Sequence, residues 1–89
     1  ETLPIEISNL INLQIFYLNN NKINTISKEI SNLLQLEILD LSSNNIELIP
    51  IEIGNLLNLK ELYLYNNEIE FPQQHIIEKE TCEIVKYLE

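Results

Sequence analysis

The sequence predicts an α/β solenoid, in which short coils of the chain stack and place parallel strands side by side. The main observation is an interval of 23 residues between equivalent positions along most of the 89-residue chain. Leu10, Leu33 and Leu56 lie at this interval, and asparagines recur at the same interval among apolar positions. A fixed period of this length is typical of solenoids, whose coils bury their apolar sides against their neighbours. We therefore expect a right-handed superhelix with its strands on the concave face.

The first element of each coil is a short strand. Leu39 and Leu41 alternate with Ile38 and Asp40, which is the period of a strand with one buried face. The cluster Ser-Ser-Asn-Asn that follows predicts a turn. Strands are expected with their centres at Tyr17, Asp40 and Tyr63.

The rest of the coil returns the chain to the start of the next strand. Ile46 and Ile49 are expected to point inward, and Pro50 marks an irregular bend. Ile53 and Leu56 have the i, i+3 spacing of a helical turn, which predicts a short α or 3₁₀ helix at 51–56. This return supplies the crossover that parallel strands require.

Three segments share the pattern LxxLxLxxNxI, namely 13–23, 36–46 and 59–69, with Phe16 in place of one leucine. Segments 3–10 and 49–56 follow LPxxIxxL, and 27–33 does so with Ser27 in place of proline. Over about residues 1–72 the sequence resembles the 23-residue class of the leucine-rich repeat family. This class is typical of intracellular signalling scaffolds and of many bacterial proteins, so the resemblance implies recognition of another protein.

The chain divides into a partial repeat, three repeats and a cap. The expected bounds are 1–10 for a return segment, 11–33, 34–56 and 57–72 for the repeats, and 73–89 for a C-terminal helical cap. In the cap, Ile76, Ile84 and Leu88 are among apolar residues at helical spacing. Pro72 suits a helix start and Thr81 could cap a second segment. Such helices would cover the last coil and its open strand edge.

Asn21, Asn44 and Asn67 form a column where each strand passes into its turn. The resemblance implies that these amides are buried and bonded to the main chain of their own and adjacent coils. The energetic cost supports this, because an unsatisfied buried amide costs about 1–3 kcal/mol. A glycan or ligand contact is the alternative, but no Asn-x-Ser/Thr sequence falls on the column.

The variable strand positions face the concave side and are the candidate partner-binding residues. They are Ile15, Tyr17, Asn19, Ile38, Asp40, Ser42, Glu61, Tyr63 and Tyr65, with Asn20, Ser43 and Asn66 at the rim. Aromatic anchors with flanking acids are typical of protein interfaces. The alternative is that Tyr and Ile stand there only because they are good strand formers.

The net charge of −9, with 14 acidic and 5 basic residues and no arginine, limits the partners. Nucleic acids and anionic membranes attract basic proteins, so neither is expected as a partner. The acidic surface either keeps the protein soluble or favours a protein partner with a basic patch.

Catalytic and metal-binding groups are few. His75 and Cys82 provide two ligands, which do not close a zinc site, so His75 is expected in solvent and Cys82 packed on the last coil. Asp40 and Glu61 could be neighbours across strands, but on an open wall they are expected to be solvated. With Gly54 as the single glycine there is no glycine-rich phosphate loop. We predict no enzyme activity, no metal and no cofactor.

Two expectations concern the ends of the chain and its compartment. The sequence starts at Glu1 partway through a repeat, as an excised or processed piece would. Leu13, Phe16 and Leu18 should then be thinly covered, which predicts self-association through this end. A single cysteine excludes an internal disulfide framework and favours a reducing compartment such as the cytoplasm.

The sequence thus predicts a non-catalytic protein–protein interaction module that binds a partner on its concave strands. Two alternatives stay open. The chain could be the regulatory fragment of a larger signalling protein or enzyme, linked to a GTPase or kinase. It could also be a structural spacer without a ligand of its own.

Overall fold

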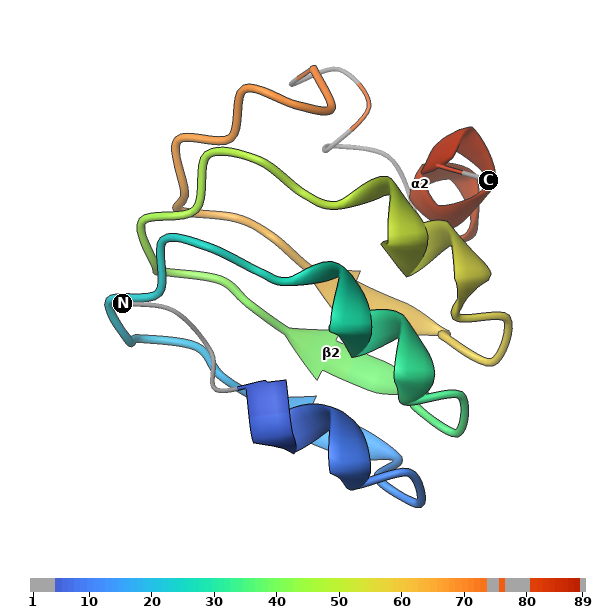
Figure 1. The fold of residues 1–89 in the computed structure, drawn as a ribbon. Helices are drawn as coiled ribbons and strands as arrows, with labels where there is room; N and C mark the ends of the chain where they lie inside the picture. The colour runs from blue at the N-terminus through green and yellow to red at the C-terminus, as the bar shows by residue number, and fades with distance from the viewer. Residues whose placement is uncertain (1–4, 74–75, 77–80, 89) are drawn as a thin grey trace.

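The computed structural model describes residues 5–73, 76 and 81–88, which form a stack of coils closed at one end by a helix (Figure 1). The coils that begin with the first two strands each contain a strand, a turn and an irregular return that ends in a 3₁₀ helix. The elements are η1 (Ile5–Asn9), β1 (Ile15–Tyr17), η2 (Lys28–Asn32), β2 (Ile38–Asp40), η3 (Ile51–Asn55), β3 (Glu61–Tyr63) and α2 (Thr81–Leu88). The predicted α/β solenoid is confirmed.

The strands form one parallel sheet in the order β1-β2-β3. The register follows the 23-residue interval, since Phe16 pairs with Leu39 and Leu39 with Leu62. The strands are centred one residue earlier than predicted, because the regular pairing ends at Tyr17, Asp40 and Tyr63. The chain turns at once after these residues, so the apparent alternation in the sequence continues beyond the strand itself.

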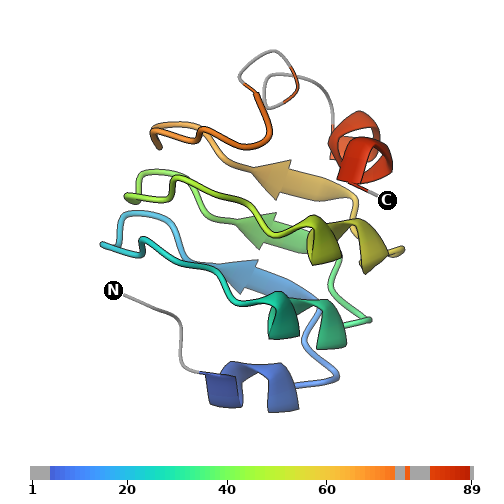
Figure 2. The ribbon, with the colours of Figure 1, turned by 45° about the horizontal axis from the view of Figure 1, so that its top comes forward.

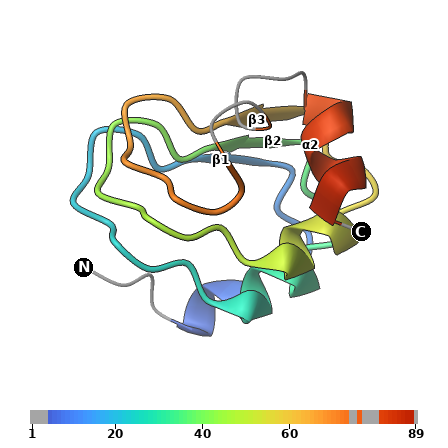
Figure 3. The same ribbon diagram turned by 90° about the horizontal axis from the view of Figure 1, so that it is seen from above.

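The sheet and the 3₁₀ helices lie on opposite sides of the coils (Figure 3). The apolar columns form one buried hydrophobic cluster. Leu36, Leu39 and Leu41 of the second repeat are inaccessible to solvent. On the return, Ile46, Ile49, Ile53 and Leu56 are buried as predicted. The 3₁₀ helix η3 also lies where the spacing of Ile53 and Leu56 predicts a helical turn.

The first coil has less cover than the second. Leu13, Phe16 and Leu18 are only partly buried, whereas their counterparts Leu36, Leu39 and Leu41 are fully buried. Leu10 is exposed, although Leu33 and Leu56 in the same column are buried. The expectation of a thinly covered first coil is therefore confirmed.

At the other end, helix α2 packs on η3 and β3 (Figure 2). Ile84, Val85 and Leu88 are its buried residues. The hydroxyl Oγ1 of Thr81 accepts a hydrogen bond of 2.7 Å from the backbone N–H of Leu62, so this side chain ties the helix to the edge of β3. The predicted helical cap is thus present over Thr81–Leu88.

Two expectations about the C-terminal region have different outcomes. Cys82 was expected against the last coil, and this is wrong, because its side chain is exposed. It lies off the stripe of Ile84, Val85 and Leu88, which is the face that meets the repeats. His75 lies outside the described residues. Pro72, expected at a helix start, is a buried bend residue, and residues 74–75 and 77–80 after it lie outside those described. No helix in the described part of the chain is both long and apolar enough to span a bilayer.

Candidate functional site

The ends of the strands are fixed by the side-chain amide of Asn44, which is 7% exposed. Its oxygen accepts a hydrogen bond of 3.1 Å from the backbone N–H of Ile23, in the preceding coil. Its nitrogen donates to the carbonyls of Leu18 (3.1 Å), Leu41 (2.9 Å) and Ser42 (3.1 Å). The side chain therefore bonds both its own coil and the one before it, as the resemblance implied.

Asn67 repeats this arrangement one coil further along. Its oxygen accepts from the N–H of Ile46 at 3.0 Å, and its nitrogen donates to the carbonyls of Leu41 and Leu64, both at 3.0 Å. Asn21 departs from the expectation of burial, since its side chain is exposed. Its nitrogen donates to Leu18 and Asn19 within its own coil. Asn67 is half-buried, so the expectation of burial is confirmed in full for Asn44 of the middle coil alone among the three.

Each strand is followed by one residue in the left-handed region of backbone conformation. These residues are Asn20 (φ 61°), Ser43 (φ 57°) and Asn66 (φ 57°). Asparagine tolerates this conformation better than most residues. The turn leads the chain away from the sheet soon after the outward-facing strand residues. These residues therefore lie on an open surface of the sheet.

We call the outward-facing residues of the strands and their extensions the strand face. Six of the predicted residues are well placed there: Ile15, Tyr17, Glu61, Tyr63 and Tyr65 are exposed, and Asp40 is half-buried between two of them. Ile38 and Asn19 are half-buried. Tyr17, Asp40 and Tyr63 lie in one row across the three strands, because Tyr17 pairs with Asp40 and Asp40 with Tyr63.

Ser42 was predicted to line this surface, and this is wrong, because it is 1% exposed. Its hydroxyl donates to Oδ1 of Asp40 at 2.6 Å, and its backbone N–H donates to the same oxygen at 3.0 Å. Tyr65, at the same position of the next coil, is exposed, whereas the short side chain of Ser42 turns to the carboxylate of Asp40 and is covered. The role of Ser42 in the structure is to hold the Asp40 carboxylate.

Tyr63 is held on both sides along its own strand. Its hydroxyl donates a hydrogen bond to Oε1 of Glu61. Its ring meets that of Tyr65 edge to face, with the centroids 6.5 Å apart. The hydrogen bond to Glu61, followed by desolvation and the negative charges of Glu61 and Asp40, raises the pKa of Tyr63 above its ordinary value of 10.0.

The two carboxylates of the strand face do not lie directly opposite each other. Glu61 lies opposite Ile38 and Asp40 lies opposite Tyr63, so the acids are diagonal neighbours. Each carboxylate is engaged by a hydroxyl donor, Ser42 for Asp40 and Tyr63 for Glu61. Within residues 5–73 and 81–88, no three His, Cys, Asp or Glu side chains gather as a metal site would require.

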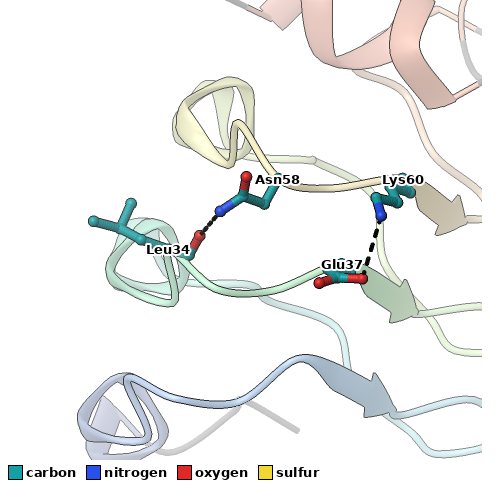
Figure 4. Close-up of polar contacts among 4 residues, drawn as sticks. All are labelled: Leu34, Glu37, Asn58 and Lys60. Carbon is teal, nitrogen blue, oxygen red and sulfur yellow. Dashed lines mark hydrogen bonds and ion pairs between the residues drawn. The ribbon is translucent and has the colours of Figure 1, made fainter.

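The entry side of the strands is tied by contacts between successive coils (Figure 4). The amide nitrogen of Asn58 donates to the carbonyl of Leu34 at 2.9 Å, and Lys60 Nζ lies 3.6 Å from Glu37 Oε1. Both side chains of this ion pair are well exposed to solvent, so its contribution to stability is small. It does, however, neutralise the lysine closest to the strand face.

Two apolar features of the surface were not predicted. A groove of about 620 Å³ opens where the returns leave the turns, with Leu48, Ile51 and Phe71 among its walls and Glu47 as its one ionisable residue. A second feature is an exposed apolar column before the strands, formed by Ile11, Leu34 and Leu57. The sequence indicates this column, since its three residues lie at the 23-residue interval, each directly after one of Leu10, Leu33 and Leu56.

Comparison with protein families finds matches to the Leucine Rich Repeat pattern at residues 12–33, 35–56 and 58–79. Among solved structures, a leucine-rich repeat protein of Leptospira interrogans is similar, with 37% sequence identity and a TM-score of 0.77. The similarity covers 84% of this chain and 19% of that protein, so the chain spans about a fifth of the length of this relative. A comparison with curated proteins finds no match.

Proposed function

The chain belongs to the leucine-rich repeat family, and from this premise we propose that it is a non-catalytic module that binds a partner protein on its strand face. Domains of this family generally mediate protein–protein interaction. The observation that carries the proposal is the row of Tyr17, Asp40 and Tyr63, with Tyr65 beside it, on an open sheet surface. Exposed tyrosines held in place by neighbours are effective interface anchors, because they lose little conformational entropy on binding.

The chemistry of the described surface supports a binding role over a catalytic one. The acids of the strand face are diagonal to each other and line neither of the two hollows of about 620 and 380 Å³ among the described residues. The groove on the return side is lined mostly by apolar groups and has one carboxylate, Glu47. Neither place combines a nucleophile, a base and a group that would stabilise developing charge.

Site-specific photo-crosslinking tests the proposal. A photoreactive phenylalanine analogue at position 65 should capture a partner protein from an extract of the source cells, and the same analogue at exposed Glu83 on α2 serves as the control. Introducing Tyr17→Ala and Tyr63→Ala should abolish the adduct at position 65 while the circular dichroism spectrum stays unchanged.

The outcomes separate the candidate functions. Adducts that form only from position 83, or that survive both alanine substitutions, would contradict docking on the strand face. Absence of an adduct from either position would support a structural spacer. The regulatory-fragment alternative makes a different claim, that the partner is another domain of the same polypeptide. The regulatory-fragment alternative is favoured if position 65 crosslinks only to another domain of the longer parent protein.

We further propose that isolated copies of this chain associate through the end that carries η1. Leu10 and Ile11 are exposed there, and a hollow of about 380 Å³ lies between Asn9 and Leu13. Strand β1 lies at the edge of the sheet on the same side. An apolar end beside an open strand edge favours pairing with a second copy.

A further inference from the structure

We propose that the strand face binds an arginine side chain from an extended basic segment of the partner, with Asp40 as the anionic contact and Tyr17 and Tyr63 on its two sides. The inference rests on the proposed function, since it names the chemistry of the partner at that same surface. Three independent features support it: the spacing of the two rings, the balance of charge, and the way in which the groups are held.

The spacing comes from the register of the sheet. Tyr17, Asp40 and Tyr63 occupy the same row on β1, β2 and β3. Neighbouring strands are about 4.8 Å apart, so the backbones of the two tyrosines are separated by about 10 Å with the carboxylate midway. A cation seated on Asp40 would then lie within the roughly 6 Å over which aromatic rings attract cations.

The charges on the strand face are of one sign. Asp40 and Glu61 are its two ionised groups, and neither forms an ion pair within residues 5–73 and 81–88. The nearest lysine in sequence, Lys60, is paired with Glu37 at the entry to the strands. With a net charge of −9 over the whole chain, an acidic partner would be repelled and a basic one attracted.

The groups are fixed before any partner arrives. Among the described residues, both hydrogen bonds to Asp40 end on Oδ1, donated by the N–H and the hydroxyl of Ser42. The other oxygen is therefore available on a carboxylate that is already oriented. Tyr63 is likewise held by Glu61 and Tyr65. Prior ordering of this kind lowers the entropy cost of binding.

A guanidinium group fits this arrangement better than an ammonium group. It is planar, less strongly hydrated, and able to stack on an aromatic ring while it donates to a carboxylate. Lysine presents a compact, strongly hydrated charge that gains less from the flanking rings. The row thus favours arginine over lysine, and favours either over a neutral residue of the same shape.

Nuclear magnetic resonance titration with synthetic peptides tests the proposal. The probe is acetyl-Gly-Arg-Gly-Arg-Gly-amide, and the comparison peptides carry lysine or neutral citrulline in place of arginine. The arginine peptide should shift the amide signals of β1, β2 and β3 and leave those of α2 in place. We expect the lysine peptide to bind about threefold more weakly, and the citrulline peptide to cause no shifts.

Two protein variants separate a specific contact from general attraction between opposite charges. Asp40→Asn and Glu83→Gln each remove one negative charge, but Glu83 is an exposed residue of α2 and is not part of the strand face. The first should weaken the arginine peptide by about fivefold or more and the second by less than about twofold. Tyr17→Leu, which leaves every charge in place, should also weaken binding by about threefold. Spectra without peptide confirm that each variant is folded.

Equal weakening by Asp40→Asn and Glu83→Gln, or shifts centred on α2, would overturn the proposal. So would equal binding of the citrulline and arginine peptides. Failure here is distinguishable from failure of the proposed function. If no peptide binds but the crosslink from position 65 still forms and still requires Tyr17 and Tyr63, the strand face binds a partner of different chemistry.

Discussion

Asn44 joins two coils through four hydrogen bonds of a single side chain. An apolar side chain of similar size would leave the N–H of Ile23 and several carbonyls buried without partners. Asn44→Leu is therefore expected to lower the free energy of unfolding by about 2–4 kcal/mol. Thermal denaturation would show this as a fall in Tm of roughly 10 °C or more.

The matched control is Asn21→Leu in the same column. Asn21 is exposed and its two donated bonds stay within its own coil, so the loss should be below about 1 kcal/mol. An Asn44→Leu protein that melts at the wild-type temperature would contradict the cross-coil role. Equal losses at both positions would contradict the claim that burial decides the effect.

The raised pKa of Tyr63 provides a second prediction at this scale. The hydrogen bond to Glu61 is the largest cause, so Glu61→Gln should bring the pKa of Tyr63 back toward 10.0, as followed by NMR of the ring carbons. The folded chain holds this proton more tightly than the unfolded chain does. The contribution of Tyr63 to stability is thus complete below pH 10 and decreases as the pH rises above it. An unchanged pKa in the Gln variant would show that another group causes the shift.

Single residues also show where sequence reasoning reached its limit. The burial of Leu39 and the bonding of Asn44 were predictable, because the 23-residue interval places each in a column with one environment. Ser42 was expected to be exposed, but its short side chain is covered in the middle coil, where its hydroxyl bonds Asp40. Cys82 could have been placed correctly, since helical spacing separates it from the stripe of Ile84, Val85 and Leu88.

Among the elements, helix α2 is coupled to the sheet by one polar contact and one apolar face. Thr81→Val would remove the acceptor of the Leu62 N–H and keep the shape of the side chain, so we expect a loss of about 1–2 kcal/mol. Ile84→Ala, at a residue 1% exposed, should cost about 2–4 kcal/mol. Urea denaturation of both variants measures these losses.

Tyr87→Ala is the control on the same helix, because Tyr87 is exposed and its contacts, a tilted ring contact with Phe71 and a hydrogen bond to Gln73, lie at the surface. Its loss should be smaller than either. If amide hydrogen exchange in β3 were unaffected by Thr81→Val, the contact between Thr81 and Leu62 would not protect the edge of β3.

The elements themselves were largely predictable. The strand, turn and 3₁₀ helix of each coil follow from local periods and from the polar cluster after each strand. The row of Tyr17, Asp40 and Tyr63 was predictable too, once the interval fixed the register. The hydrogen bond between Thr81 and Leu62 was not, because it joins residues from different types of element and depends on how the helix docks.

For the molecule as a whole, the two ends differ in cover, and this leads to a prediction about assembly. Sedimentation velocity at millimolar concentration should show dimers, because Leu10, Ile11 and the edge of β1 are open. Leu10→Ser should weaken this association, whereas Leu57→Ser, at a residue 79% exposed in the last repeat, should not. A wild-type chain that stays monomeric at this concentration would contradict the prediction.

The hydrogen bonds that each of Asn44 and Asn67 forms with the preceding coil limit how the length of the gene can change. Asn44 bonds Leu18 and Ile23, and Asn67 bonds Leu41 and Ile46, the residues one interval later. If unequal recombination deleted codons 34–56, Asn67 would meet the same backbone groups that Asn44 meets now. Gain or loss of whole multiples of 23 codons therefore preserves the asparagine hydrogen bonds between successive coils. An insertion of any other length would have to form a loop outside the stack.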